Sequence, residues 1–233
     1  MKTLLLGILF FGCTAQQIQS ITDAIGYEDE LTTDQVANGL KEALIKGVST
    51  GTQKVGKVDG YFKNPQIKIP FPPDVQKVEN TLRDIGLGSE VDRFVKTLNR
   101  GAEEAAKEAK PVFVSAIKQM TINDAWSILK GEDKEAATNY LKRTASNELR
   151  SKFSPIVQKA LNQTNATKYY SDIITRYNKI PLVDDVNPDL EAYATEKAME
   201  GLFVMIAEEE KKIRSNPAAR TTDLLKRVFK EQD

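Results

Sequence analysis

The sequence predicts an all-α protein, a multi-helix domain with one short extended or edge-strand insert near residues 60–72. Apolar residues recur at helical spacing along most of the chain, as in the stripe that runs from Val91 to Met120. Several of these stripes begin after a Thr or Ser that is followed three residues later by an acidic or amide residue, the spacing of a capping box. Only the insert alternates with period two.

The first half of the chain predicts four helical segments. The first begins at Thr32 or Thr33 and carries glycines that would let another helix approach closely: Gly39, Gly47 and Gly51. The second runs from Asp74 to about Gly86. In the long pattern of residues 89–120, Pro111 should kink or split the helix. Thr121 and Asp124 form a capping box that opens a short helix ending near Gly131.

The second half predicts helices at residues 133–149, 153–163 and 166–179, a long helix that starts at Asn187–Asp189, and a last helix capped at Thr221 or Thr222. The middle of the long helix, "GLFVMIA", is apolar on all sides and should lie in the core. Its polar end should be a solvated face, on which acids pair with bases four residues later: Glu208 with Lys212, and Glu210 with Arg214.

The insert differs from the helices in its periodicity. Ile67, Ile69 and Phe71 alternate with polar or proline positions, which indicates a chain with one buried side. A helix and a central strand are both excluded by the prolines: Pro65, Pro70, Pro72 and Pro73. We therefore expect an edge strand or extended segment that lies over the helices.

The N-terminus predicts secretion and a lipid anchor. Lys2 precedes a short apolar run, too short to span a bilayer but typical of a signal peptide over residues 1–12. Gly12 and Cys13 resemble the end of a bacterial lipobox, in which the cysteine is lipidated, although Phe10 departs from its pattern. The alternative is an ordinary signal peptide cut near Ala15. Residues 13–30 would then be a lipidated tether, and residues 31–233 a single helical domain.

The composition excludes several classes of function. The chain has 33 basic and 33 acidic residues, so it lacks the strong field that draws a protein to nucleic acid. It has no histidine, the usual general base near neutral pH and the commonest transition-metal ligand. One cysteine forms neither an internal disulfide nor a cysteine-cluster zinc site. We expect no cofactor.

Two weak site signals remain in the sequence. Four oxygen-bearing residues occupy positions 1, 3, 5 and 12 of a calcium loop: Asp185, Asn187, Asp189 and Glu196. The sixth position holds Leu190 in place of the glycine that the sharp turn needs, so a helix cap is the alternative to a metal site.

The second signal is Arg220, which lies directly before the cap of the last helix. Guanidinium groups bind carboxylate or phosphate through paired hydrogen bonds, which makes Arg220 a candidate anion-binding residue. The alternative is a structural role, in which Arg220 pairs with a carboxylate or with carbonyls of the turn.

Several blocks of sequence carry a resemblance to a known family. These blocks are "LTTDQVANGLKEAL", "NPQIKIPFP", "AIKQMTINDAWSIL", "KAMEGLF" and "NPAARTTDLLKRVF", in this order. Together they resemble the bacterial secreted family called domain of unknown function 4197, over about residues 31–229. The resemblance implies secretion and an α-helical domain, and it implies no catalytic residue.

Three classes of function stay open. The first is an envelope protein, anchored through a lipid such as palmitate on Cys13 and facing the periplasm, that acts as a non-enzymatic binding or scaffold domain. Its partners would be the membrane and an envelope protein or small apolar ligand, not nucleic acid. The second is a metal-dependent enzyme built on carboxylates. The third is a carrier that holds an apolar ligand between its helices.

Overall fold

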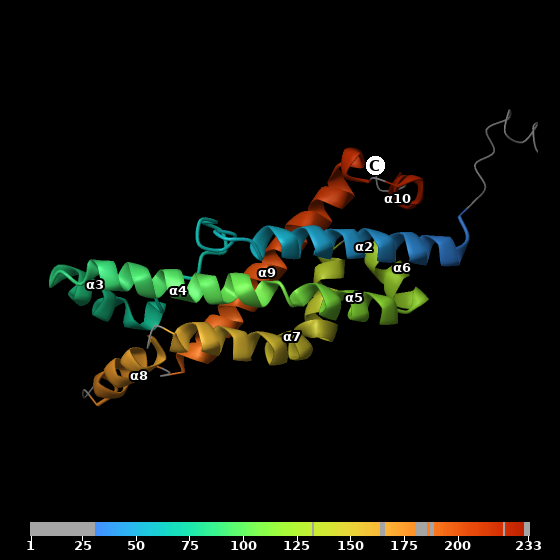
Figure 1. The fold of residues 1–233 in the computed structure, drawn as a ribbon. Coiled ribbons are helices and arrows are strands. Elements are labelled where there is room, and N and C mark those ends of the chain that lie inside the picture. Colours follow the sequence, from blue (N-terminus) through green and yellow to red (C-terminus); the bar gives the residue numbers. More distant parts are fainter. Residues whose placement is uncertain are drawn as a thin grey trace, which may run out of the picture. The chain divides into compact units, whose positions relative to one another are not determined.

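Helix α9 (Leu190–Ser215) is the centre of the fold. The structure is a computed structural model, and it describes residues 31–131, 133–163, 166–179, 186, 189–220 and 222–230. Helix α9 packs against α2 (Thr33–Val55), α4 (Gly88–Ala106) and α7 (Ala136–Asn162), and Figure 1 shows it crossing between them. Its middle is buried on nearly all sides, as its composition predicts, with Val204 the exposed exception. The helices belong to one compact unit, Thr33–Asp233.

The remaining helices surround this centre. Around α2 lie α5 (Ala109–Gln119), α6 (Ile122–Lys130) and α10 (Asp223–Phe229). At the other end lie α3 (Gln76–Asp84), which packs on α4, and α8 (Ala166–Tyr177), which packs on α7 and α9. Two short 3₁₀ turns, Pro73–Val75 and Pro217–Ala219, precede α3 and follow α9. The prediction of an all-α, multi-helix fold is confirmed.

The glycines of α2 let neighbouring helices approach closely, as their positions in the sequence predict. A Cβ added at Gly39 would lie 2.7 Å from a methyl group of Val228 on α10, and one at Gly51 would lie 3.4 Å from Ile206 on α9. Any side chain at Gly39 would therefore push α10 away, because 2.7 Å is well inside van der Waals contact.

The proline at residue 111 splits the long pattern as expected. Helix α4 ends at Ala106 and α5 begins at Ala109, so Pro111 lies in the first turn of α5, where its missing N–H is tolerated. Pro155 behaves differently. The two helices expected at 133–149 and 153–163 are one helix, α7, that runs through Pro155 on its exposed side, so their separation was a wrong prediction.

Of the two forms expected for the insert near residues 60–72, extended segment or edge strand, the edge strand is wrong: turns occupy most of this segment, and the part of the chain that the structure describes contains no strand. The alternation is nevertheless real, because Ile67, Ile69 and Phe71 are buried. A side chain takes the place of a partner strand. Asn99 of α4 accepts from the N–H of Ile69 at 2.9 Å and donates to its carbonyl at 2.8 Å.

The glutamates at the end of α9 also differ from their predicted solvated face. Glu209 and Glu210 are buried, and Glu209 pairs with Lys54 of α2 and with Lys212. Glu210 does pair with Arg214, at 2.8 Å, but this pair lies inside the fold. The carboxylate accepts hydrogen bonds from the first turn of α7 as well, and thus joins two long helices.

The predicted signal peptide, residues 1–12, and the predicted tether, residues 13–30 with Cys13, lie outside the described residues. Among the helices that are described, none has the length and apolar character needed to cross a bilayer.

Candidate functional site

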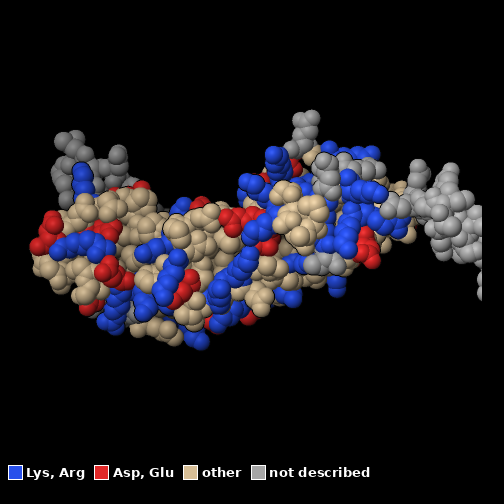
Figure 2. Space-filling model, turned by 90° about the horizontal axis from the view of Figure 1, so that it is seen from above, with Lys and Arg blue, Asp and Glu red and all other residues tan. Residues whose placement is uncertain are grey.

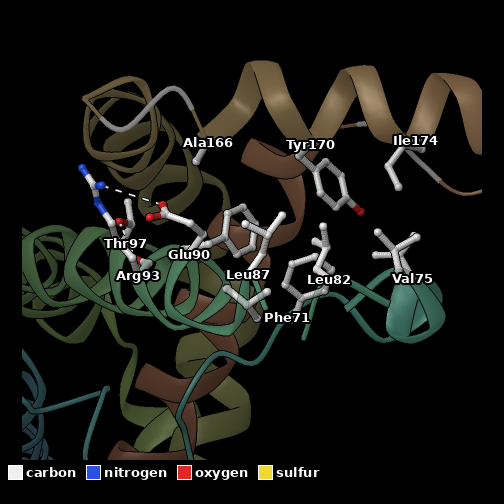
Figure 3. Close-up of a pocket in the computed structure, with 13 residues that line it drawn as sticks. Phe71, Val75, Leu82, Leu87, Glu90, Arg93, Thr97, Ala166, Tyr170 and Ile174 are labelled. Carbon is white, nitrogen blue, oxygen red and sulfur yellow. Dashed lines mark hydrogen bonds and ion pairs between the residues drawn. The ribbon is translucent and has the colours of Figure 1, made fainter. Parts of the chain in front are cut away.

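An apolar pocket of about 590 Å³ lies between α3, α4 and α8. The segment before α3 closes one side of it with Phe71 and Val75, and α3 contributes Val78 and Leu82. Figure 3 shows Phe71, Val75 and Leu82 converging with side chains of α4 and α8. Ligand pockets of proteins typically enclose about 300–1,000 Å³ and are lined mainly by apolar side chains, so both size and lining fit a small-molecule site.

Aromatic rings form the inner wall of the pocket. The ring of Phe94 on α4 lies 5.0 Å from the ring of Phe71 and 6.4 Å from the ring of Tyr170 on α8, measured between centroids. Phe71 and Tyr170 are buried, whereas Phe94 is only half-buried. The three rings join elements that are distant in the sequence and form a continuous aromatic wall of the pocket.

Helix α3 forms the outer wall, and none of its residues is buried. Its apolar residues Val78 and Leu82 face the pocket and are only half-buried, because the space beside them is empty of protein. Arg83 ties the helix to α4 through an ion pair with Asp92, at 3.0 Å, and it also pairs with Glu79 of α3 itself, at 2.8 Å.

A glycine turn connects α3 to α4. Gly86 has φ of +86°, and the N–H of Leu87 bonds to the carbonyl of Leu82 at 2.9 Å, the geometry of a Schellman cap. The turn leaves Ile85 and Leu87 exposed, and Leu87 lines the pocket. The apolar surface of the pocket thus continues to the tip of this hairpin.

Charge is confined to one end of the pocket. Glu90 and Arg93, both well exposed, form an ion pair of 3.8 Å there (Figure 3). The opposite end lies between Val75 and Ile174 and is apolar apart from the hydroxyl of Tyr170.

A second cavity, of about 540 Å³, is polar in character. It lies at the ends of α6 and α9, with Trp126 and Leu129 on one wall and charged residues around them: Lys130, Asp133, Lys134, Lys211 and Arg214. Figure 2 shows acids and bases interspersed over one face, with lysines and arginines gathered toward the end where α10 lies. Arg214 already pairs with Glu210, and Asp133 accepts the N–H of Glu135, so much of this charge serves the fold.

Arg220, the candidate anion-binding residue, is 2% exposed. Its guanidinium donates to the carbonyls of Ile213 at 3.0 Å and Arg214 at 2.8 Å, where α9 ends, and lies 5.6 Å from the ring centroid of Phe229. These are the contacts with turn carbonyls that the structural alternative expects. Binding of an anion by Arg220 stays a prediction.

The four residues of the candidate calcium loop are described only in part. Asp185 and Asn187 lie outside the described residues. Asp189 caps α9 by accepting the N–H of Ala192 at 2.9 Å, and Glu196 lies inside α9 and pairs with Arg150 of α7 at 2.5 Å. In the described ranges no group of three acidic or cysteine side chains converges as metal ligands would. The metal site stays a prediction.

Sequence reasoning missed the apolar pocket. Its walls come from residues 71–97 and 166–174, and no local motif joins these two segments. One signal was present: Val78, Leu82 and Ile85 recur at helical spacing in a helix too short to form a core of its own. Such an apolar face needs a partner surface, and here it faces an open pocket.

The fold and the pocket together define an all-α domain with an open apolar pocket at the end formed by α3, α4 and α8. Comparison with known families gives the particular family. The chain belongs to the family described as "Protein of unknown function (DUF4197)", whose sequence model matches residues 30–230. No curated protein and no solved structure matches the chain.

Proposed function

We propose that this protein is a binding domain that takes a small apolar ligand into the pocket between α3, α4 and α8, and that a lipid on Cys13 holds it at the bacterial envelope, facing the periplasm. The observation that carries the first part is the open cavity of about 590 Å³ with half-buried apolar walls. Leaving such surface in water costs about 25 cal/mol per Å², which a bound apolar molecule recovers.

The buried carboxylates favour binding over carboxylate catalysis. An enzyme of that class brings acids together in a cleft, as acid and base or as metal ligands. In the described chain the buried acids are dispersed, and each has a cationic partner: Glu103 with Arg100, Glu209 with Lys54, and Glu210 with Arg214. Each of these groups ties helices or turns together, and none of the three lines the apolar pocket.

A fluorescent apolar probe tests the proposed pocket. N-phenyl-1-naphthylamine is uncharged and brightens in apolar surroundings, so titration with the purified protein should give saturable binding. Val78→Trp fills the pocket from α3 and should abolish it. Val58→Trp makes the same exchange at a residue that is 74% exposed and does not line the pocket, and should leave binding unchanged. Equal binding by both variants would overturn the proposal.

A further inference from the structure

Tyr170 brings an unpartnered hydroxyl to the apolar pocket. The residue is 5% exposed, yet its hydroxyl forms no hydrogen bond with any residue that the structure describes. Other tyrosines with described side chains donate to backbone carbonyls at 2.6–3.4 Å: Tyr61, Tyr140 and Tyr193. The ring is buried, but the hydroxyl keeps accessible surface in the pocket, where water or a ligand can accept its hydrogen bond. The partner of Tyr170 is therefore to be sought in the pocket.

The surroundings of this hydroxyl are apolar. Figure 3 shows the side chain of Tyr170 reaching from α8 toward Leu82 and Val75, with Ile174 beside it. The ring is held in place by its stacked contact with Phe94, at an interplanar angle of 19°. The ion pair of Glu90 and Arg93 lies at the other end of the pocket.

Charge and protonation limit what the hydroxyl can bind. Burial, and to a smaller extent the negative charge of Asp74, raise the pKa of Tyr170 to about 12. The phenol is therefore protonated at neutral pH and is a hydrogen-bond donor. The same burial and the same carboxylate disfavour a second negative charge beside it, since no lysine or arginine lines this end of the described pocket.

We infer that the apolar ligand carries an uncharged oxygen acceptor of the ester or ketone type, and that the hydroxyl of Tyr170 donates a hydrogen bond to it. Phe94 and Phe71 then contact the hydrocarbon part, and the exposed tip of the α3–α4 hairpin adjoins it. This inference rests on the proposed function, because it names the class of ligand for the same pocket.

Matched ligands separate the hydrogen bond from the apolar contact. Methyl undecanoate and tridecane have chains of equal length, and each is titrated to displace N-phenyl-1-naphthylamine from the purified full-length protein. Tyr170→Phe should weaken binding of the ester about 3- to 10-fold, the usual value of one neutral hydrogen bond. It should leave binding of the alkane unchanged. The undecanoate anion should bind more weakly than its methyl ester.

The displacement experiment distinguishes failure of the inference from failure of the proposed function. An ester affinity that Tyr170→Phe leaves unchanged, or an anion that binds more tightly than the ester, overturns the inference while the pocket stands. Failure of the probe and of both uncharged ligands to bind the wild-type protein overturns the proposed function together with it.

The stability of the unliganded protein gives an independent readout. Tyr170→Phe should unfold at the same urea concentration as the wild type or a higher one, because the hydroxyl has no described partner to lose. The control is Tyr61→Phe, which removes a hydroxyl that donates to the carbonyl of Ala198 at 2.6 Å and should lower the midpoint. A Tyr170→Phe protein weakened as much as Tyr61→Phe would show that the hydroxyl already has a protein partner, against the inference.

Discussion

Glu210 on α9 closes the first turn of α7 at Thr138, whose backbone N–H and hydroxyl both donate to Glu210 Oε2 at 2.8 Å. The other carboxylate oxygen accepts the N–H of Ala137 at 3.0 Å and pairs with Arg214. A helix begins with N–H groups that have no partner within the helix, so a carboxylate from another helix satisfies them and also complements the helix dipole.

Loss of this carboxylate should therefore be costly. Glu210→Ala leaves Arg214 partly buried without its acid and leaves two N–H groups unpaired, which should lower the free energy of unfolding by about 3–5 kcal/mol. Urea unfolding measures the change. Glu208→Ala, two residues earlier and only half-buried, is the matched control and should change it by no more than about 0.5 kcal/mol. Similar values for the two variants would contradict the role of Glu210.

Asn99 should stabilise the turn segment at residues 60–72 by pairing with the backbone of Ile69. Asn99→Leu has similar volume but leaves both the N–H and the carbonyl of buried Ile69 unpaired, so we expect a loss of about 2–4 kcal/mol. Hydrogen exchange gives a local readout: the amide of Ile69 should be protected in the wild type and exchange much faster in the variant. An amide of Ile69 that stays protected in Asn99→Leu would rule out this pairing.

Substitutions of Arg220 and Leu225 distinguish a structural role of Arg220 from a role in anion binding. Arg220→Ala frees the carbonyls at the end of α9 and should lower the free energy of unfolding by about 1–3 kcal/mol. Leu225→Ala, at a fully buried site on α10, should lower it by about 2–5 kcal/mol. Lys226→Ala, on the exposed side of the same helix, serves as control. An Arg220→Ala protein of unchanged stability would support the anion-binding role.

The capping box of α6 should be sensitive to acid. The Thr121 hydroxyl, and then the Thr121 N–H, donate to Asp124 and lower the pKa of its carboxyl. A lowered pKa means that the native state binds fewer protons, so the stabilisation is complete above the unfolded pKa of about 3.9. It is lost as the pH falls through the lower native value. The difference in unfolding free energy between wild type and Asp124→Asn should therefore shrink below about pH 4.

The predicted lipid anchor depends on one side chain. Cys13 is the only cysteine in the chain, so Cys13→Ala should abolish incorporation of a fatty-acid label in cells and release the protein from the membrane fraction. Cys13→Ser, the nearest isostere, should behave alike. A labelled Cys13→Ala protein would refute lipidation at this residue.

The features that could be predicted from the sequence are those that depend on contacts between residues close together in the chain. Thr121 with Asp124, and Thr222 before α10, cap helices through contacts within three residues, so their spacing is visible in the sequence. Glu210 and Arg214 also have a recognisable spacing, but its meaning depends on α7, 72 residues away at Thr138. The same spacing is found on solvated helices, and only tertiary packing distinguishes the two cases.

The apolar pocket could not be predicted from the sequence for the same reason, because it depends on tertiary packing. Phe71, Phe94 and Tyr170 meet only after α4 and α8 have packed, and each of them alone is typical of an ordinary core residue. The site is a cavity, a space between packed helices that no side chain fills. Sequence patterns record which residues prefer burial, but they do not record where burial stays incomplete.

The shallow packing of α3 has a consequence for how the protein exchanges between states. Since no residue of α3 is buried, detaching this helix exposes little of the area that sets the global free energy of unfolding. Helix α3 should therefore belong to the cooperative units that open most easily, whereas the middle of α9, buried on nearly all sides, should open only with the whole domain. We therefore expect α3 to detach, and the pocket to open to solvent, without unfolding of the core.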